Sequence, residues 1–210
     1  MMVLGDLFKR SNVEYKFAVP VYSAHLEGLT LSKVQTEFET VYNDLKDNNK
    51  FQHNEKSNSH MLSDVTFTSN LLDQYNTEVF KAELNSHLRS YLASIESDIG
   101  INRPFEYKID SSWMTLNVKN SYAVVHSHGD ADISGVYYFK TTGRDGNFFF
   151  ETPNKLTKSS YCFRHWQCNS EHTPEVGKLM LFPGWLEHGV GTNHTDSDRV
   201  SISFNINFIR

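Results

Sequence analysis

The feature that most constrains the fold is a strict alternation of polar and apolar residues over Arg199–Phe208. Successive side chains of a β-strand point to opposite faces, so this pattern predicts a strand with one face in the core. Its polar face carries the following side chains: Arg199, Ser201, Ser203, Asn205 and Asn207. Because this face has no Lys or Glu, two interpretations stay open, an edge strand facing water or the wall of a hydrated pocket. In the second, the guanidinium of Arg199 and the hydroxyl of Ser201 would form a good receptor for a carboxylate.

Other segments also alternate, and turn residues separate them. The predicted strands are Ala18–Ala24, Trp113–Val118, Ala123–His128, Ile133–Thr141, Asn147–Glu151, Tyr161–Gln167, Lys178–Phe182, His188–Gly191 and Arg199–Ile209. So many short strands in succession after Phe105 predict a sandwich or barrel of the jelly-roll type. The 15 Phe and 10 Tyr also favour sheet over a helix bundle.

Two segments before these strands have helical periodicity. Apolar residues recur at intervals of three and four in Leu31–Asp47 and in Asn70–Asp98, which predicts two amphipathic helices. Two such helices before a run of strands predict a mainly β fold with both helices packed on one outer face of a sheet. The polar segment Asn48–Ser63 between them reads as a surface loop.

The size and composition limit the class of protein. A chain of 210 residues is expected to form a single domain, with residues 1–104 as strand and helical support and residues 105–210 as the β core. A net charge of −5 argues against nonspecific nucleic-acid binding. Cys162 and Cys168 are too few for a disulfide framework, and the start resembles no signal peptide. The low cysteine count predicts a reduced, cytoplasmic setting, and the lack of a membrane-length apolar run predicts no membrane span.

A cluster of potential metal ligands precedes one predicted strand. His126, His128 and Asp130 are spaced two apart, which places them on one face of an extended segment. The best third ligand from a distant strand is His188, which follows the turn at Pro183 and Gly184. Imidazole together with carboxylate suits Fe(II), Mn(II) or Zn(II). The sequence therefore predicts one metal site built from these segments.

Four motifs follow one another along the chain. Their order is His-x-His or His-x-Asp, then Ser-Gly-Val-Tyr-Tyr, then Gly-Lys-Leu-x-Leu-Phe-Pro-x-x-x-x-His-x-Val, then Arg-x-Ser-x-Ser-Phe-Asn. This order resembles that of the 2-oxoglutarate- and Fe(II)-dependent oxygenases. It is most similar to an oxygenase family known mainly from marine bacteria and their phages. The similarity is close over Trp113–Phe208 and loose from Phe17 onward.

The resemblance implies a double-stranded β-helix that holds Fe(II) and uses 2-oxoglutarate and dioxygen as co-substrates. It implies that Arg199, eleven residues beyond His188, grips the far carboxylate of 2-oxoglutarate, with Ser201 as a partner hydroxyl. It also implies hydroxylation of an unidentified substrate, with decarboxylation of 2-oxoglutarate to succinate. The metal ligands would be the only catalytic residues, and Tyr137 or Tyr138 could donate a hydrogen bond to the co-substrate.

The ligand register stays open at this stage. His126 and His128 could both bind, as the family often has His-x-His, or His128 could pair with Asp130, whose carboxylate would offset the charge of Fe(II). A site of His126 and His188 without a carboxylate is a third alternative.

Two other functions compete with the oxygenase hypothesis. A cupin-like metalloenzyme would use His126, His128 and His188 and would have no need for Arg199. A jelly-roll binding or structural module would need neither the three histidines nor Arg199, because fold does not fix function.

The segments Asn48–Ser63 and Asn154–His172 could cover the pocket and select a substrate that the sequence does not identify. Edge strands of such sheets often pair, so a homodimer is also an expectation.

Overall fold

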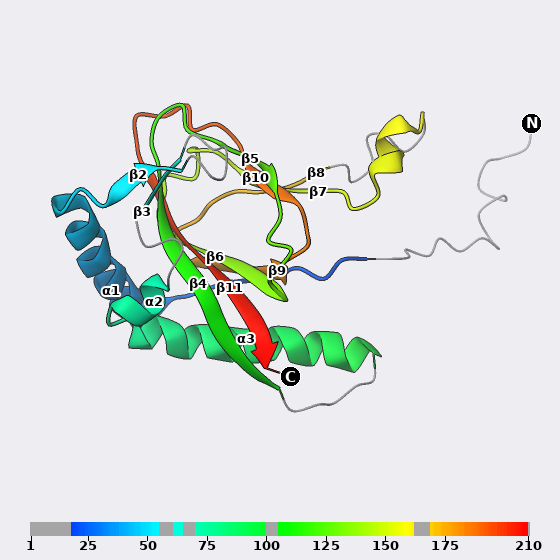
Figure 1. Cartoon of the computed structure of the whole chain (residues 1–210), viewed down its shortest axis with the longest axis horizontal. Helices are drawn as coiled ribbons and strands as arrows, with labels where there is room; N and C mark the ends of the chain where they lie inside the picture. The colour runs from blue at the N-terminus through cyan, green and yellow to red at the C-terminus, as the bar shows by residue number, and fades with distance from the viewer. Residues whose placement is uncertain (1–17, 55–60, 65–69, 100–104, 162–168, 210) are drawn as a thin grey trace, which may run out of the picture.

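The computed structural model describes residues 18–54, 61–64, 70–99, 105–161 and 169–209 (Figure 1). Two antiparallel sheets face each other, and helices cover the outer face of the larger one. The predicted mainly β fold with helices on one sheet is therefore confirmed. Cys162, Cys168 and most of the predicted strand Tyr161–Gln167 lie outside the described residues.

The larger sheet has seven strands in the order β1-β9-β6-β11-β4-β3-β2. Its strands are β1 (Tyr22–His25), β2 (Phe51–His53), β3 (Leu62–Asp64), β4 (Glu106–Asn117), β6 (Ile133–Lys140), β9 (Lys178–Pro183) and β11 (Arg199–Ile209). The longest pairing joins β11 to β4, from Arg199 opposite Asn117 to Ile209 opposite Glu106. The alternating strand predicted at Arg199–Ile209 is thus a central strand, so its polar face does not lie at a sheet edge.

The smaller sheet has four strands in the order β5-β10-β7-β8. They are β5 (Ala123–His126), β7 (Phe148–Glu151), β8 (Asn169–His172) and β10 (His188–Val190). Apolar side chains from both sheets pack between them, including Phe148, Phe150, Met180 and Phe182. A short 3₁₀ helix, Lys155–Ser159, leaves the end of β7 and projects from the body of the molecule (Figure 1).

The helices are α1 (Gly28–Asp47), α2 (Leu71–Gln74) and α3 (Glu78–Ile99). Phe80 of α3 contacts both the other long helix and the larger sheet. Its ring lies 4.9 Å from that of Phe38 in α1 and 6.0 Å from that of Phe204 in β11. All three side chains are fully buried. Burial of this kind stabilises by roughly 25 cal/mol per Å² of apolar surface, which explains why the helices stay on this face.

Strand alternation separates the two cores. In β6, Tyr137 and Phe139 point to the helices, whereas Val136 and Tyr138 point to the smaller sheet. In β11 the apolar side chains face the helices. The polar side chains Arg199, Ser201, Ser203 and Asn205 therefore face the space between the sheets, where they line a cavity.

Two predictions of secondary structure were wrong in detail. The helix predicted at Asn70–Asp98 is interrupted, because α2 ends at Gln74 and α3 begins at Glu78. Glu37 of α1 accepts hydrogen bonds from the backbone N–H groups of Val79 and Phe80, so tertiary contacts fix this second start. The predicted loop Asn48–Ser63 contains β2 and the start of β3. The strand β3 pairs with β4, and its own polar sequence gives no indication of this pairing.

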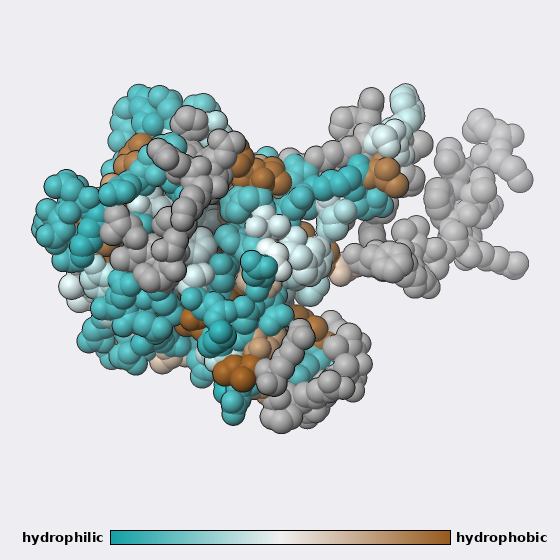
Figure 2. Space-filling model, viewed as in Figure 1, coloured by the Kyte–Doolittle hydropathy of each residue, from teal (hydrophilic) through white to brown (hydrophobic). Residues whose placement is uncertain are grey.

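The surface seen in Figure 2 is largely hydrophilic, with apolar residues scattered over it. Among the described residues, no helix has the length and hydrophobicity needed to cross a membrane.

Candidate metal centre

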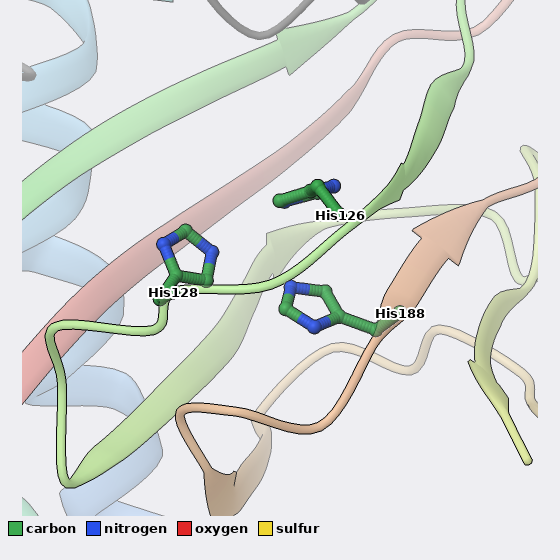
Figure 3. A group of neighbouring side chains, drawn as sticks. All are labelled: His126, His128 and His188. Atoms are coloured by element: carbon green, nitrogen blue, oxygen red, sulfur yellow. The ribbon is translucent and has the colours of Figure 1, made fainter. Parts of the chain in front are cut away.

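Three histidines converge at one end of the cavity between the sheets (Figure 3). His126 is the last residue of β5, His128 lies in the loop that follows, and His188 is the first residue of β10. Ring centroids are 4.5 Å apart for His126 and His188, 5.1 Å for His126 and His128, and 5.2 Å for His128 and His188. One ring nitrogen from each lies within 4.8 Å of the other two. This group can hold a metal ion.

Backbone carbonyls set the tautomers of two of these rings. Nδ1 of His126 lies 2.8 Å from the carbonyl oxygen of Val124, and Nδ1 of His188 lies 2.8 Å from that of Leu186. A carbonyl can only accept, so each Nδ1 carries the proton and donates it. Nε2 of both rings is then left with a free lone pair, the arrangement that metal-bound histidines use.

His128 is oriented by Asn205 of β11. The side-chain nitrogen of Asn205 lies 3.5 Å from Nδ1 of His128, and the carboxamide also bonds the hydroxyls of Ser111 and Ser134. Both hydroxyls can donate or accept, so the carboxamide can turn over without losing a partner. Its oxygen would then accept from Nδ1–H of His128 and leave Nε2 of that ring free for a metal.

Burial keeps the rings of His128 and His188 neutral. Burial, together with His126, lowers the pKa of His128 to about 4 and that of His188 to about 3. Neutral imidazole is the form that binds metal ions, so these two rings are ready to bind at neutral pH.

Close backbone packing positions the loop that carries His128. The N–H of His128 donates to the carbonyl of Gly184 at 2.8 Å, and the N–H of Gly184 donates to the carbonyl of Asp132 at 3.2 Å. A Cβ at position 184 would lie 2.1 Å from the carbonyl oxygen of Ala131. Glycine is therefore required where these two loops meet.

Asp130, the fourth predicted ligand, does not join the histidines. It is exposed in the turn between β5 and β6 and lines a polar groove beside the cavity. The turn that begins after His128 breaks the period of two on which its prediction depended, so Asp130 does not share a strand face with the two histidines.

Arg199 is the first residue of β11 and lies in the interior, with 2% of its surface exposed. Its Nη1 donates to the carbonyl of Gly146 at 2.7 Å, and its Nε has no partner. Within the described part of the chain it forms no ion pair. Burial lowers the pKa of Arg199, but a guanidinium stays protonated in proteins. The carboxylate of Asp145 favours the charged form, but it lies beyond ion-pair distance and accepts hydrogen bonds from Thr141 and Thr142. A buried charge without a direct partner is costly, so this group is suited to bind an anion.

Ser201 and Tyr138 accompany Arg199 along the cavity wall. Both are buried, and the hydroxyl of Tyr138 has no hydrogen-bond partner. Burial raises the pKa of Tyr138 to about 12, so at neutral pH its hydroxyl remains a donor. The guanidinium lies 5.9 Å from the centre of the Tyr138 ring.

Tyr137, named with Tyr138 from the sequence, lies on the opposite face of β6. It contacts Phe38 and Phe80, and its hydroxyl accepts a 3.4 Å hydrogen bond from Gln35. The tyrosine that reaches the cavity is therefore Tyr138. Because neighbouring residues of a strand point to opposite faces, only one of the two tyrosines can reach the cavity. The position of the helices, which the sequence does not give, determines that it is Tyr138.

Trp113 of β4 was not predicted as a site residue. Its ring lies 5.6 Å from that of His128, and it lines the cavity. From the alternation of a strand alone, a cavity-lining residue such as Trp113 cannot be distinguished from a residue of the hydrophobic core. His172 lies in β8, outside the cluster of three histidines, with its ring 5.4 Å from that of Phe150.

Comparison with solved structures identifies the class of fold. A prolyl-4-hydroxylase from Pseudomonas putida superposes with a TM-score of 0.59 at 10% identity, covering 90% of this chain and 92% of that one. A prolyl hydroxylase from Trichoplax adhaerens, in complex with a hypoxia inducible factor peptide, gives 0.59 at 13% identity, covering 89% and 82%. HygX from Streptomyces hygroscopicus, with nickel, 2-oxoglutarate and hygromycin B bound, gives 0.55 at 14% identity, covering 90% and 83%. At such low identity these similarities establish the fold, a double-stranded β-helix.

A family model matches part of the sequence. Residues 111–205 match the model of the family described as "Putative 2OG-Fe(II) oxygenase". That segment contains the three converging histidines together with Arg199 and Ser201. The resemblance to the 2OG-Fe(II) oxygenases that the motifs predicted is thus confirmed over this segment. Among curated proteins, none matches this sequence.

Proposed function

We propose that this chain is an Fe(II)- and 2-oxoglutarate-dependent dioxygenase that hydroxylates a second substrate. One observation carries the proposal: three imidazoles converge on one cavity that also holds a buried guanidinium with no direct ion pair among the described residues. The reaction class converts 2-oxoglutarate, dioxygen and a C–H bond into succinate, carbon dioxide and a C–OH group.

The metal would be held by His126, His128 and His188, the first of the registers left open by the sequence. Imidazole suits Fe(II) well, and all three donors come from one end of the cavity. Three neutral ligands leave the charge of the ion uncompensated, which favours an anionic co-substrate beside it.

The co-substrate carboxylate would be held by Arg199, Ser201 and Tyr138. The unpartnered Nε of Arg199 and hydroxyl of Tyr138 supply two donors that the protein alone does not satisfy. Hydrogen bonds between a guanidinium and a carboxylate are among the strongest in proteins. The cavity, of about 270 Å³, offers room for a small dicarboxylate.

The competing functions explain fewer of these features. A cupin-like enzyme without a 2-oxo acid accounts for the three histidines and leaves the buried Arg199 without a role. A binding module accounts for neither feature.

The test is anaerobic absorption spectroscopy with Fe(II) and 2-oxoglutarate, followed by an assay of succinate release in air. We expect a weak visible charge-transfer band that Arg199→Ala abolishes and that Arg89→Ala, on the exposed side of α3, retains. Absence of the band in the unmodified protein that contains Fe(II) would contradict the proposal.

A further inference from the structure

A polar groove of about 390 Å³ lies beside the metal centre. It is bounded by Asp110 and Ser111 of β4, by residues 127–131 of the turn after β5, and by Asn205 and Asn207 of β11. His128, Ser111 and Asn205 line both this groove and the cavity that holds Arg199. The two hollows therefore meet at the candidate metal centre.

The polar face of β11 runs through both hollows. Arg199 and Ser201 line the buried end of the cavity, Asn205 stands beside His128, and Asn207 lines the groove. If 2-oxoglutarate is anchored at Arg199, the groove is the space at the other side of the metal centre. A second substrate lying there would reach the same metal centre.

The chemistry of the groove favours a polar ligand. Its lining side chains are carboxylates, carboxamides, hydroxyls and one imidazole, with Ala131 as the single apolar side chain among the described residues that line it. Such a surface offers many hydrogen-bond acceptors and little area for an apolar molecule.

The two carboxylates of the groove differ in their partners. Asp110 pairs with Lys108 at 2.6 Å and accepts from the side chain of Asn207, and the hydrogen bond from Lys108 lowers its pKa. Asp130 forms no hydrogen bond or ion pair within the described residues, although it lies two residues from His128. Asp130, in the turn next to the metal centre, is thus the carboxylate of the groove that has no positively charged partner among the described residues.

We propose that this groove binds the second substrate and that Asp130 pairs with a protonated amine on it. The inference rests on the proposed oxygenase function and adds the class of substrate. A primary amine supplies three donors and one positive charge, which match the carboxylate of Asp130 and the neighbouring carboxamide and hydroxyl oxygens. The amine could belong to a small molecule or to a lysine side chain, because the recognised group is the same.

The test compares amines with neutral counterparts in the succinate-release assay. The amine probes are putrescine, L-lysine and a lysine-containing peptide; the counterparts are butanediol, Nε-acetyl-lysine and the acetylated peptide. We expect at least one amine to stimulate succinate release and its counterpart not to do so. The arm that responds distinguishes a small amine from a protein side chain.

The variant Asp130→Asn should raise the KM for the stimulating amine by about 10-fold or more, the usual effect of losing a hydrogen bond to a charged group. The matched control is Asp196→Asn, an exposed aspartate paired with Lys119, which should leave that KM unchanged. Equal stimulation by neutral probes, no stimulation by any amine, or an unchanged KM in Asp130→Asn would overturn the inference.

The anaerobic charge-transfer band separates this failure from failure of the proposed function. If the unmodified protein lacks the band, the oxygenase proposal fails. If the unmodified protein has the band and Asp130→Asn loses it, Asp130 is a metal ligand and the substrate role is overturned.

Discussion

His188 lies directly opposite His126 in the antiparallel pairing of β10 with β5, and their ring centroids are 4.5 Å apart. Two of the three candidate ligands are therefore held at a separation that backbone register sets. The third, His128, follows β5 and is fixed by a hydrogen bond from its N–H to the carbonyl of Gly184. A rigid pair plus one loop residue is an arrangement that can bind a metal while leaving one side of it accessible.

His188→Ala should lower the affinity for Fe(II) by more than about 100-fold, since changes to outer-sphere partners alone cost about 10–100-fold. The measurement is a titration of metal-free protein with Fe(II) under anaerobic conditions. His194→Ala is the matched control, because His194 is exposed and lies outside the cluster. Retention of affinity in His188→Ala would remove His188 from the metal centre.

Arg199→Met should weaken 2-oxoglutarate binding without destabilising the ligand-free protein. Removing one member of a buried charged pair costs about 2–5 kcal/mol, so Kd should rise by roughly 30-fold or more. The ligand-free protein loses a buried charge that has one hydrogen bond, and replacement by an apolar side chain is often neutral or stabilising. Thermal unfolding with and without 2-oxoglutarate measures both effects. A large loss of stability in the absence of ligand would indicate a structural role.

The two neighbouring tyrosines of β6 should respond differently to loss of the hydroxyl. Tyr138→Phe should weaken 2-oxoglutarate binding by about 3–10-fold, the value of one neutral hydrogen bond, with no loss of stability because its hydroxyl is unpartnered. Tyr137→Phe should leave binding unchanged, since its hydroxyl meets Gln35 on the helical side. Titration of 2-oxoglutarate into both variants decides the matter, and equal effects would contradict the placement of these side chains.

Periodicity predicts the parts of the fold in which local pattern and tertiary environment agree. The alternation of Arg199–Phe208 marks a face for the core and a face for the cavity, and β11 has that division. The helical repeat of Leu31–Asp47 predicts α1 to within three residues at its start. In both segments burial follows directly from the spacing of the apolar residues.

The failures occur where pairing or packing overrides local pattern. Leu62 and Ser63 extend the large sheet because they lie opposite Leu116 and Thr115 of β4, a contact no local pattern encodes. For the candidate site, spacing identified the histidines and left the register open. The turn after His128, which carries Asp130 away, depends on contacts with the distant Gly184.

Gly184→Ala should disturb the metal centre from outside it. The added Cβ would lie 2.1 Å from the carbonyl oxygen of Ala131 and 2.8 Å from that of His128, and backbone cannot yield as a flexible side chain can. We expect a loss of stability of about 1–3 kcal/mol from overpacking, and weaker Fe(II) binding as the loop bearing His128 moves. Denaturant unfolding and metal titration measure the two effects separately.

Gly129→Ala is the matched control for this variant, because a Cβ at position 129 meets no atom within 4 Å although the residue adjoins His128. It should retain both the stability and the metal affinity of the unmodified protein. If Gly184→Ala binds Fe(II) as tightly as Gly129→Ala does, the packing of the two loops does not position His128. In that case the hydrogen-bonded contact with Asn205 would have to hold the ring by itself.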